Sequence, residues 1–332
     1  MTKTTKPKNG LEIINAGFLT LLQDAGRNQV MHQGLANGGA MDRHAWAWAN
    51  RLLGNNYNTP ALEITFGGLQ LVSQVATRIA ITGAEVPFTI NGQPQALWSS
   101  INLMPGDKLQ LDAPKAGLRS YLAVSGGFKV PQNLGGSCAT LVREGTGGQN
   151  ENGQKVAEGD LLPCQSLTTK ELAQQSFKVP AANIPDYKQP LLLDVILGAQ
   201  VDRFPAASLA RFFNETYRLS PQMDRMGARL DGPPLDVIGE KLISEGISLG
   251  AIQVTADGQP IILLNDRQTI GGYPKLGAVI PRSLDALAQR LPGSEVRFKA
   301  VSLHQAQLRE KEFLQFFNTS IQLTNASFST QK

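Results

Sequence analysis

The sequence predicts a mostly β protein that contains two copies of one domain. Residues 41–43 (Met-Asp-Arg) recur as residues 223–225, and further short matches follow in the same order at nearly constant spacing. They pair Glu63 with Glu245, Gly68 with Gly250, 89–94 with 269–274 and 105–111 with 292–298. The 33 Gly and 19 Pro residues favour many short elements joined by turns. Residues that both copies keep are expected to be architectural, and those in one copy are better candidates for chemistry.

Short apolar runs separated by Gly, Pro, Asn and Asp are typical of strands in a barrel or sandwich. The expected strands are 11–14, 68–72, 78–82, 88–90, 108–111, 120–124, 191–197, 252–255, 260–264 and 296–301. Helices are expected at 43–53, between Asp42 as N-cap and Gly54 as C-terminal glycine, and at 283–291 and 303–317. We expect a disordered arm (1–9), a first domain (10–165), a linker (166–190), a second domain (191–305) and a C-terminal helix and tail (306–332).

Composition excludes several classes of function. The net charge of +4 is spread along the chain, so nucleic-acid binding is not expected. No apolar run approaches 18 residues, and the polar start lacks a signal core, so neither a membrane span nor secretion is expected. Cys138 and Cys164 have no metal or redox spacing and are interpreted as reduced thiols of a cytoplasmic protein.

Several common motifs are missing from the sequence. There is no G-x-x-x-x-G-K-[ST] and no G-x-G-x-x-G after a strand, so neither a P-loop nor a Rossmann fold is expected. Three histidines without metal spacing predict no metal site. Ser137 lies in a near match to G-x-S-x-G that lacks the last glycine, and is interpreted as a turn residue. No Met-Lys-Met sequence is present, so the chain is expected to carry no biotin of its own.

The matched acidic residues are interpreted first as structural. Asp42 and Asp224 each open a turn or helix, where a carboxylate accepts backbone N–H bonds. Glu63 and Glu245 lie between apolar residues and glycine, and a buried carboxylate needs a partner. The arginine of each Met-Asp-Arg triplet is the expected partner, which gives Arg225 for Glu245.

The unmatched residues of the second copy form the stronger candidate site. Asp266, Arg267, Gln268 and Thr269 stand where the first copy has a single charge, and two glycines and Lys275 follow. Arginine binds oxyanions bidentately and lysine supplies a mobile charge, so this run suits a small carboxylate, carbamoyl or phosphate group. A salt-bridged hairpin is the alternative. Ser220 and Gln222 add uncharged donors for a urea-like or lactam amide, or simple turn chemistry.

These segments also resemble a known family. The resemblance lies in 21–27, 40–42, 49–55, 61–68, 121–127, 220–230, 244–246, 251–254, 257–260 and 266–275, and it runs from about residue 11 to 305. The family comprises the allophanate hydrolase subunit 2 proteins, which are also known as the C subunits of 5-oxoprolinase, urea amidolyase-related proteins or biotin-dependent carboxyltransferase-family proteins. It implies two tandem cyclophilin-like β-barrel domains with a few short helices.

The resemblance also assigns roles residue by residue. It implies catalytic roles for Asp266, Arg267 and Lys275. Substrate-binding roles follow for Ser220, Gln222, Gln253, Gln268, Thr269, Asp24 and Arg27, and supporting roles for Asp42, Glu63, Asp224, Arg225 and Glu245. The chain departs from its relatives at residues 35–38 and at Ile270, which changes no charged group.

The resemblance implies part of an enzyme. Its relatives open 5-oxo-L-proline to L-glutamate with ATP, together with the A and B subunits of 5-oxoprolinase, or transfer a carboxyl group from carboxybiotin to urea. Another relative antagonises a kinase inhibitor, a regulatory role. The sequence contains no fused biotin carboxylase, biotin carrier or amidase region, which favours 5-oxoprolinase. ATP is expected as cosubstrate, bound by this chain or by a partner subunit.

Overall fold

The computed structural model describes residues 9–132, 134–240 and 242–319 and divides them into two compact units. Unit 1 contains the described parts of 1–26, 43–186 and 316–332. Unit 2 contains 27–42 and 187–315. Residues 27–42, which the sequence analysis places in the first domain, therefore pack with the second. The predicted arm over 1–9 lies, except for Asn9, outside the described residues.

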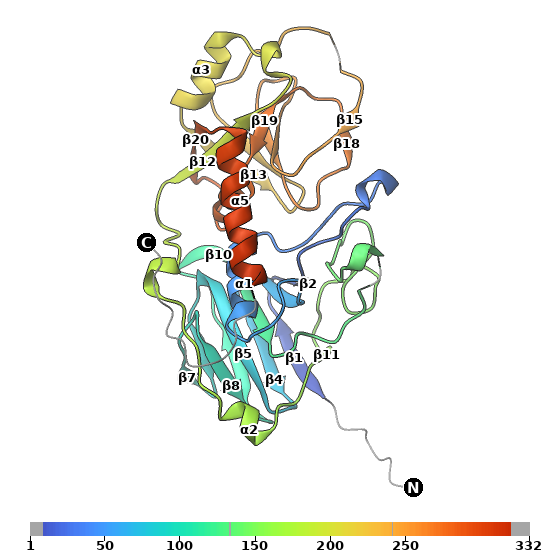
Figure 1. Ribbon diagram of the computed structural model, residues 1–332, viewed down its shortest axis with the longest axis vertical. Helices are drawn as coiled ribbons and strands as arrows, with labels where there is room; N and C mark the ends of the chain where they lie inside the picture. The colour runs from blue at the N-terminus through green and yellow to red at the C-terminus, as the bar shows by residue number, and fades with distance from the viewer. Residues whose placement is uncertain (1–8, 133, 241, 320–332) are drawn as a thin grey trace. The chain divides into compact units, whose positions relative to one another are not determined.

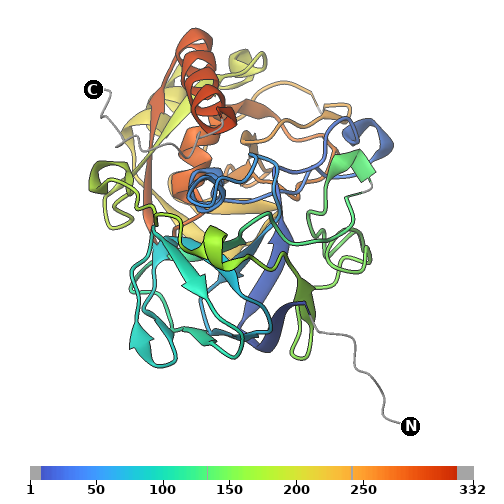
Figure 2. The same cartoon turned by 60° about the horizontal axis from the view of Figure 1, so that its bottom comes forward.

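Unit 1 is built from two antiparallel sheets (Figures 1 and 2). The six-stranded sheet has the order β11-β1-β4-β9-β6-β7, and the five-stranded sheet has the order β2-β3-β10-β5-β8. The strands are β1 (Gly10–Ala16), β2 (Leu19–Gln23), β3 (Ala61–Thr65), β4 (Leu69–Ser73), β5 (Thr77–Glu85), β6 (Phe88–Ile90), β7 (Gln93–Pro94), β8 (Ser100–Leu103), β9 (Lys108–Leu111), β10 (Ala116–Val124) and β11 (Leu161–Pro163).

The burial of each strand in unit 1 follows its place in the sheets. Strand β4 alternates buried and half-buried residues, the pattern of a sheet with one face on the core. Strands β3, β5 and β10 are buried almost throughout. Helix α1 (Arg43–Arg51) packs against β5 and β10 and buries Trp46 and Trp48. The helix covers one face of the five-stranded sheet, which explains why these strands are buried on both faces. Gly54 follows at φ 68°, as the predicted C-terminal glycine requires.

Unit 2 contains a closed seven-stranded barrel with the order β12-β19-β16-β17-β14-β13-β20 (Figure 1). Its strands are β12 (Leu191–Leu197), β13 (Tyr217–Met223), β14 (Gly227–Asp231), β16 (Ala251–Val254), β17 (Pro260–Leu263), β19 (Lys275–Val279) and β20 (Glu295–Ala300). Strand β20 closes the ring by pairing in parallel with β12 and antiparallel with β13. A separate two-stranded antiparallel sheet pairs β15 (Glu245–Gly246) with β18 (Ile270–Gly271).

The core of unit 2 is aromatic at one end of the barrel. Phe212 lies on helix α3 (Ala206–Asn214) and stacks on Phe298 of β20 at a centroid distance of 4.1 Å. Tyr217 of β13 packs edge-on against the same Phe298 ring. These contacts close the barrel end with large apolar rings, which contribute most of the burial free energy at such positions.

The remaining helices are short, apart from the last. They are α2 (Thr169–Leu172), α4 (Pro281–Leu287) and α5 (Leu303–Asn318), with 3-10 turns η1 (Met31–Gln33), η2 (Leu134–Gly136), η3 (Ala181–Asn183) and η4 (Val201–Arg203). Helix α2 lies within the predicted linker and begins with a capping box between Thr168 and Glu171. Within the described residues, no helix is both long and apolar enough to span a bilayer. The prediction of a mostly β protein is confirmed.

Candidate functional site

The candidate site is a cavity of about 460 Å³ on the barrel of unit 2. Three carboxamide side chains line it, those of Gln222, Gln253 and Gln268. The other lining residues are Pro221, Met223, Asp224, Met226, Gly227, Arg229, Ile261, Leu263 and Tyr273. A pocket with an apolar wall and a few convergent amides suits a small uncharged polar ligand.

Gln253 is the most informative side chain of the cavity. It lies on β16, and the pairing of β16 with β19 shifts register between Ile252 and Gln253, an irregularity that re-aims a side chain. Its side chain is 2% exposed, and its amide nitrogen has no hydrogen-bond partner among the residues that the structure describes. A buried donor without an acceptor costs about 1–3 kcal/mol, so a ligand acceptor here gains free energy.

Gly271 packs closely against the Gln253 amide. A Cβ atom at Gly271 would lie 2.9 Å from the Gln253 amide nitrogen and 2.6 Å from the side chain of Ile247. A side chain at position 271 would therefore collide with the amide. This close approach explains a glycine within β18.

A bulged hairpin presents one wall of the cavity. The pairing of β13 with β14 shifts register between Leu219 and Met223, and the Ser220 hydroxyl accepts the Gln222 N–H at 3.3 Å inside this irregular stretch. Asp224 accepts the N–H groups of Met226 and Gly227 at 2.7 and 3.1 Å. The Asp224 carboxylate thus fixes the turn that places Gln222.

Asp266, predicted to be catalytic, is held by an arginine. Its carboxylate accepts two hydrogen bonds from Arg225, at 2.8 Å from Nε and 3.0 Å from Nη2. Arg225 also donates to the carbonyl of Gly39 at 2.8 Å. The neighbouring Asn265 donates its amide to the same stretch of carbonyls, most closely to that of Ala40 at 3.0 Å. Asp266 and Arg225 therefore tie residues 38–40 to the barrel.

Arg267 is buried in the same way. Its side chain is 3% exposed and donates to the carbonyls of Ile247 and Leu264 and to the Asn37 amide oxygen, at 3.1, 3.3 and 3.1 Å. Desolvation lowers the pKa of Arg267 to about 10. The guanidinium thus holds the 31–37 stretch, and its predicted part in catalysis stays a prediction.

Lys275 has a partner that the sequence analysis assigned differently. Its ammonium pairs with Glu245, which also accepts from Gln200. The expected pair of Glu245 with Arg225 is wrong, because the partners of Glu245 are Lys275 and Gln200, and its side chain on β15 is 48% exposed. The hydrogen bond from Lys275 holds the pKa of the Glu245 carboxyl below its usual range. The Lys275 side chain is 17% exposed.

Two further predicted substrate-binding residues are buried in their own units. Asp24 is fully buried in unit 1, where it accepts from Gly26 N–H at 2.9 Å, the Ser137 hydroxyl at 2.6 Å and Cys138 N–H at 2.7 Å. Arg27, in unit 2, is 2% exposed and its main chain pairs with Asn37. Neither side chain is among those that line the cavity.

The supporting residues are also anchored internally. Glu63 on β3 is buried, accepts the Tyr121 hydroxyl at 2.8 Å and lies 3.8 Å from Arg119. Asp42 accepts from Tyr187 at 3.2 Å and from Gln289 at 2.7 Å. Burial, with the nearby Asp42 carboxylate, raises the pKa of Tyr187 well above its usual value. The matched residues Glu63 and Glu245 thus have different surroundings, one buried and one exposed.

The structure therefore gathers part of the predicted set. Gln222, Asp224, Gln253 and Gln268 line the cavity, whereas Asp266, Arg267 and Lys275 do not. Thr269 contributes its carbonyl to Ile247 N–H at 3.0 Å. Sequence reasoning missed Tyr273 and Arg229 as lining residues. A tyrosine directly after two glycines was the available signal for Tyr273, because such glycines let a loop turn and expose the ring.

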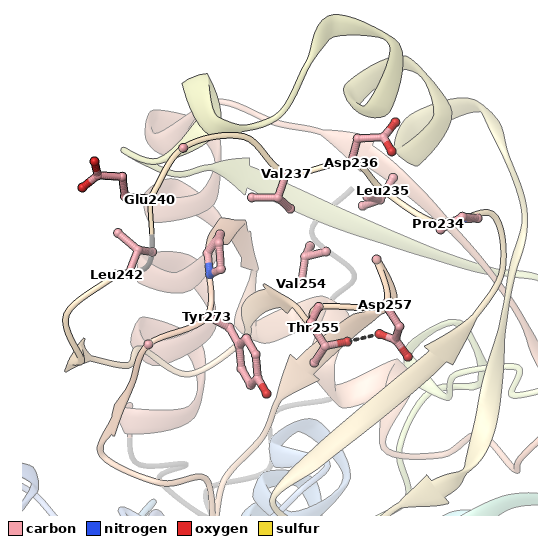
Figure 3. Close-up of a pocket in the computed structure, with 15 residues that line it drawn as sticks. Pro234, Leu235, Asp236, Val237, Glu240, Leu242, Val254, Thr255, Asp257 and Tyr273 are labelled. Carbon is pink, nitrogen blue, oxygen red and sulfur yellow. Dashed lines mark hydrogen bonds between the residues drawn. The ribbon is translucent and has the colours of Figure 1, made fainter.

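A second cavity, of about 780 Å³, adjoins the first at Tyr273, which lines both. Figure 3 shows Val237 and Leu242 from one loop facing Val254 and Tyr273 across it. Its other lining residues are Pro234, Leu235, Asp236, Gly239, Glu240, Thr255, Ala256, Asp257, Gly258, Gly272 and Pro274. In the described part of the chain, no group of three or more His, Cys, Asp or Glu side chains has a metal-binding arrangement.

Comparison with known proteins places this arrangement in a family. The family model described as "Carboxyltransferase domain, subdomain A and B" matches residues 33–300. This range includes all the residues that line the first cavity and all those that line the second. The chain belongs to this carboxyltransferase-domain family. The family resemblance expected from the sequence is thereby confirmed.

The similar proteins fall into two groups, 5-oxoprolinase subunits and urea amidolyases. The chain is 35% identical over 314 residues to the C subunit of 5-oxoprolinase from Escherichia coli, a match that covers 92% of this chain and 96% of that protein. It is 32% identical to urea amidolyase of Lachancea kluyveri over 91% of this chain but 17% of that protein. The crystal structure of the K. lactis urea amidolyase superposes with a TM-score of 0.86 at 27% identity, covering 99% of this chain and 21% of that one. These relatives are parts of enzymes.

Proposed function

We propose that this chain is one component of an ATP-dependent 5-oxoprolinase, which opens 5-oxo-L-proline to L-glutamate together with partners like the A and B subunits of that enzyme. The similarity to the C subunit of 5-oxoprolinase extends over nearly the whole of both chains. The observation that carries the proposal is the buried Gln253 amide nitrogen, which lacks an acceptor at the wall of a cavity lined by two more carboxamides.

The cavity complements each part of a five-membered lactam. The lactam carbonyl offers the acceptor that Gln253 lacks, and the amide oxygens of Gln222 and Gln268 suit the lactam N–H. Ile261 and Leu263 provide an apolar wall for the ring methylenes. Arg229 lines the same cavity and offers a cation to the substrate carboxylate. These contacts orient the amide whose C–N bond is broken as water is added.

The charged residues of the run 266–275 take supporting roles in this proposal. Asp266 and Arg267 hold residues 31–40 against the barrel through Arg225, Asn37 and main-chain carbonyls. Lys275 supplies a partly exposed cation that would stabilise developing negative charge once Glu245 is displaced.

Neither cavity fits the triphosphate of ATP. The charged residues of the described chain that line the larger cavity are Asp236, Glu240 and Asp257, which repel phosphate. Among the described residues that line the smaller cavity, Arg229 is the one cation and Asp224 is a carboxylate, which does not balance the several negative charges of a triphosphate. We propose that a partner subunit binds ATP, and we derive no step of the phosphate chemistry from this chain.

The alternative is transfer of a carboxyl group from carboxybiotin to urea or a similar amide. The carboxyltransferase family model and the urea amidolyase relatives favour it. The same cavity accommodates urea, because urea presents one carbonyl and two amide groups to the three glutamines. Arg229 distinguishes 5-oxoproline from urea, because only 5-oxoproline carries a carboxylate that could bind to it.

The decisive experiment measures glutamate release from 5-oxo-L-proline and ATP by this protein mixed with purified A-like and B-like subunits. Omission of each protein in turn is the control. Activity that disappears without this chain supports the proposal. A complex that assembles but releases no glutamate, while carboxylating urea when supplied with carboxybiotin, overturns it in favour of carboxyl transfer. Assembly with neither activity leaves a regulatory role.

A further inference from the structure

Large apolar side chains are exposed on the chain segments that form the second cavity of unit 2. Ile243 is 91% exposed, Ile270 62%, Ile238 55% and Tyr273 48%. We call these four residues the isoleucine rim. Single exposed apolar residues are common, but four on the segments that form one cavity indicate a binding surface.

Backbone geometry brings the rim together. Glu245 pairs with Gly271 and Gly246 with Ile270, so the strand that follows Ile243 lies beside Ile270. A Cβ atom at Gly272 would lie 3.2 Å from the Leu242 carbonyl, which places the loop before β15 against the residue before Tyr273. Ile238 follows Val237, which lines the cavity. Three of the rim residues are thus carried by segments that border the cavity, and the fourth, Tyr273, lines it (Figure 3).

The cavity inside the rim is apolar with an acidic edge. Leu235, Val237 and Val254 lie around it, while the Asp236 and Glu240 carboxylates point away from its centre (Figure 3). Asp236 lies 3.7 Å from Arg211, and Asp257 pairs with Arg229. The Glu240 carboxylate has no partner among the described residues, and Arg203 contacts only its main-chain carbonyl, at 2.8 Å. Glu240 is thus available to a cation from outside.

We infer that the isoleucine rim and its cavity dock a partner subunit of the proposed complex, which inserts an apolar side chain and sets a Lys or Arg beside Glu240. A small molecule that filled the cavity would leave Ile243 in water, whereas a protein surface covers it. The Glu240 carboxylate, which has no partner in the described part of the chain, complements a basic side chain of the partner. The inference rests on the proposed function for the identity of the partner.

The test measures the dissociation constants for purified A-like and B-like subunits by isothermal titration calorimetry, with the full chain. The rim variants are Ile243→Ser and Ile270→Ser, and the charge variant is Glu240→Lys. Leu192→Ser is the matched apolar control, because Leu192 is 54% exposed on β12 of the same unit. Glu215→Lys, at an exposed site after α3, is the matched charge control. Thermal unfolding checks that every variant folds.

We expect each rim variant to raise one of the two dissociation constants about tenfold or more, the typical effect of a residue at the centre of an interface. Glu240→Lys is expected to weaken the same complex and to reduce its sensitivity to salt, while both controls bind as the wild type does. Unchanged binding by folded rim variants overturns the docking inference and leaves the proposed function standing. Failure of the wild type to bind either partner overturns both. Rim-dependent self-association in sedimentation would identify a second copy as the occupant and overturn the partner assignment.

Discussion

Arg225 and Asp266 are joined by two hydrogen bonds of 2.8 and 3.0 Å, with side chains that are 9% and 12% exposed. Arg225 lies in the β13–β14 turn and Asp266 in the loop after β17, so the pair joins two loops of the barrel. Arg225 also donates a hydrogen bond to the Gly39 carbonyl. Residues 37–40 are thus held by Arg225 together with Asn265 and Arg267.

Removal of one partner of this pair is expected to destabilise unit 2. Asp266→Ala leaves a buried guanidinium without its carboxylate, which costs about 3–5 kcal/mol. Urea denaturation checks the free energy of unfolding. Arg218→Ala is the control, because Arg218 and Glu295 form a pair on the surface, where the loss is about 1 kcal/mol or less. Full stability with lost activity would show instead that Asp266 acts in catalysis.

Gln253→Leu is expected to separate binding from stability. The substitution keeps the volume and removes a buried amide nitrogen that has no partner in the described chain, so stability should stay the same or rise. The KM for the amide substrate should increase roughly tenfold or more, since the ligand acceptor loses its donor. Steady-state kinetics in the assembled complex and thermal unfolding provide the two measurements. Gln307→Leu, at an exposed position on α5, is the control and should change neither.

Asp24→Ala is expected to be a stability variant rather than a binding variant. Its carboxylate accepts two hydrogen bonds from residues 137–138 and a third from the Gly26 N–H, all within unit 1. Loss of charge-assisted bonds in a fully buried position costs about 1.5–3 kcal/mol for each unsatisfied group. Differential scanning calorimetry should show a lower Tm, whereas Asp112→Asn, on the surface, should have little effect. A normal Tm with a raised KM would contradict this structural role.

Cys164 links stability to alkaline pH. Burial raises the pKa of its thiol from 9.0 to about 11. Because the folded pKa is the higher one, this contribution to stability is complete below pH 9.0 and is lost as pH rises towards 11. Denaturation midpoints of the wild type should fall over this window more than those of Cys164→Ala.

The same thiol should be chemically inert in the folded protein. Cys164 and Cys138 are 5% and 0% exposed, and a protonated buried thiol is a poor nucleophile. A thiol reagent at about pH 8 should therefore label neither cysteine until denaturant is added. Rapid labelling of native protein would show that residues 137–139 or β11 open readily.

The sequence by itself determined the strand-rich fold. Strand and turn signals are local, because alternation of apolar residues and the placing of glycine depend on near neighbours in the chain. Helix α5 and strands β12, β16 and β20 lie where those signals predicted them, within a residue or two. The family resemblance likewise rests on contiguous motifs and was confirmed by comparison.

Tertiary structure alone decided which charged residues face inward. Asp266, Arg267 and Lys275 are neighbours in a run that looks like one oxyanion site, yet each has its own protein partner at a different place. Their pairings join residues far apart in sequence, such as Arg267 with Asn37 and Arg225 with Gly39, which no local pattern encodes. The placing of Gln253 at the cavity wall depends on a register shift between two strands and on the close approach of Gly271, and only the folded unit brings these together.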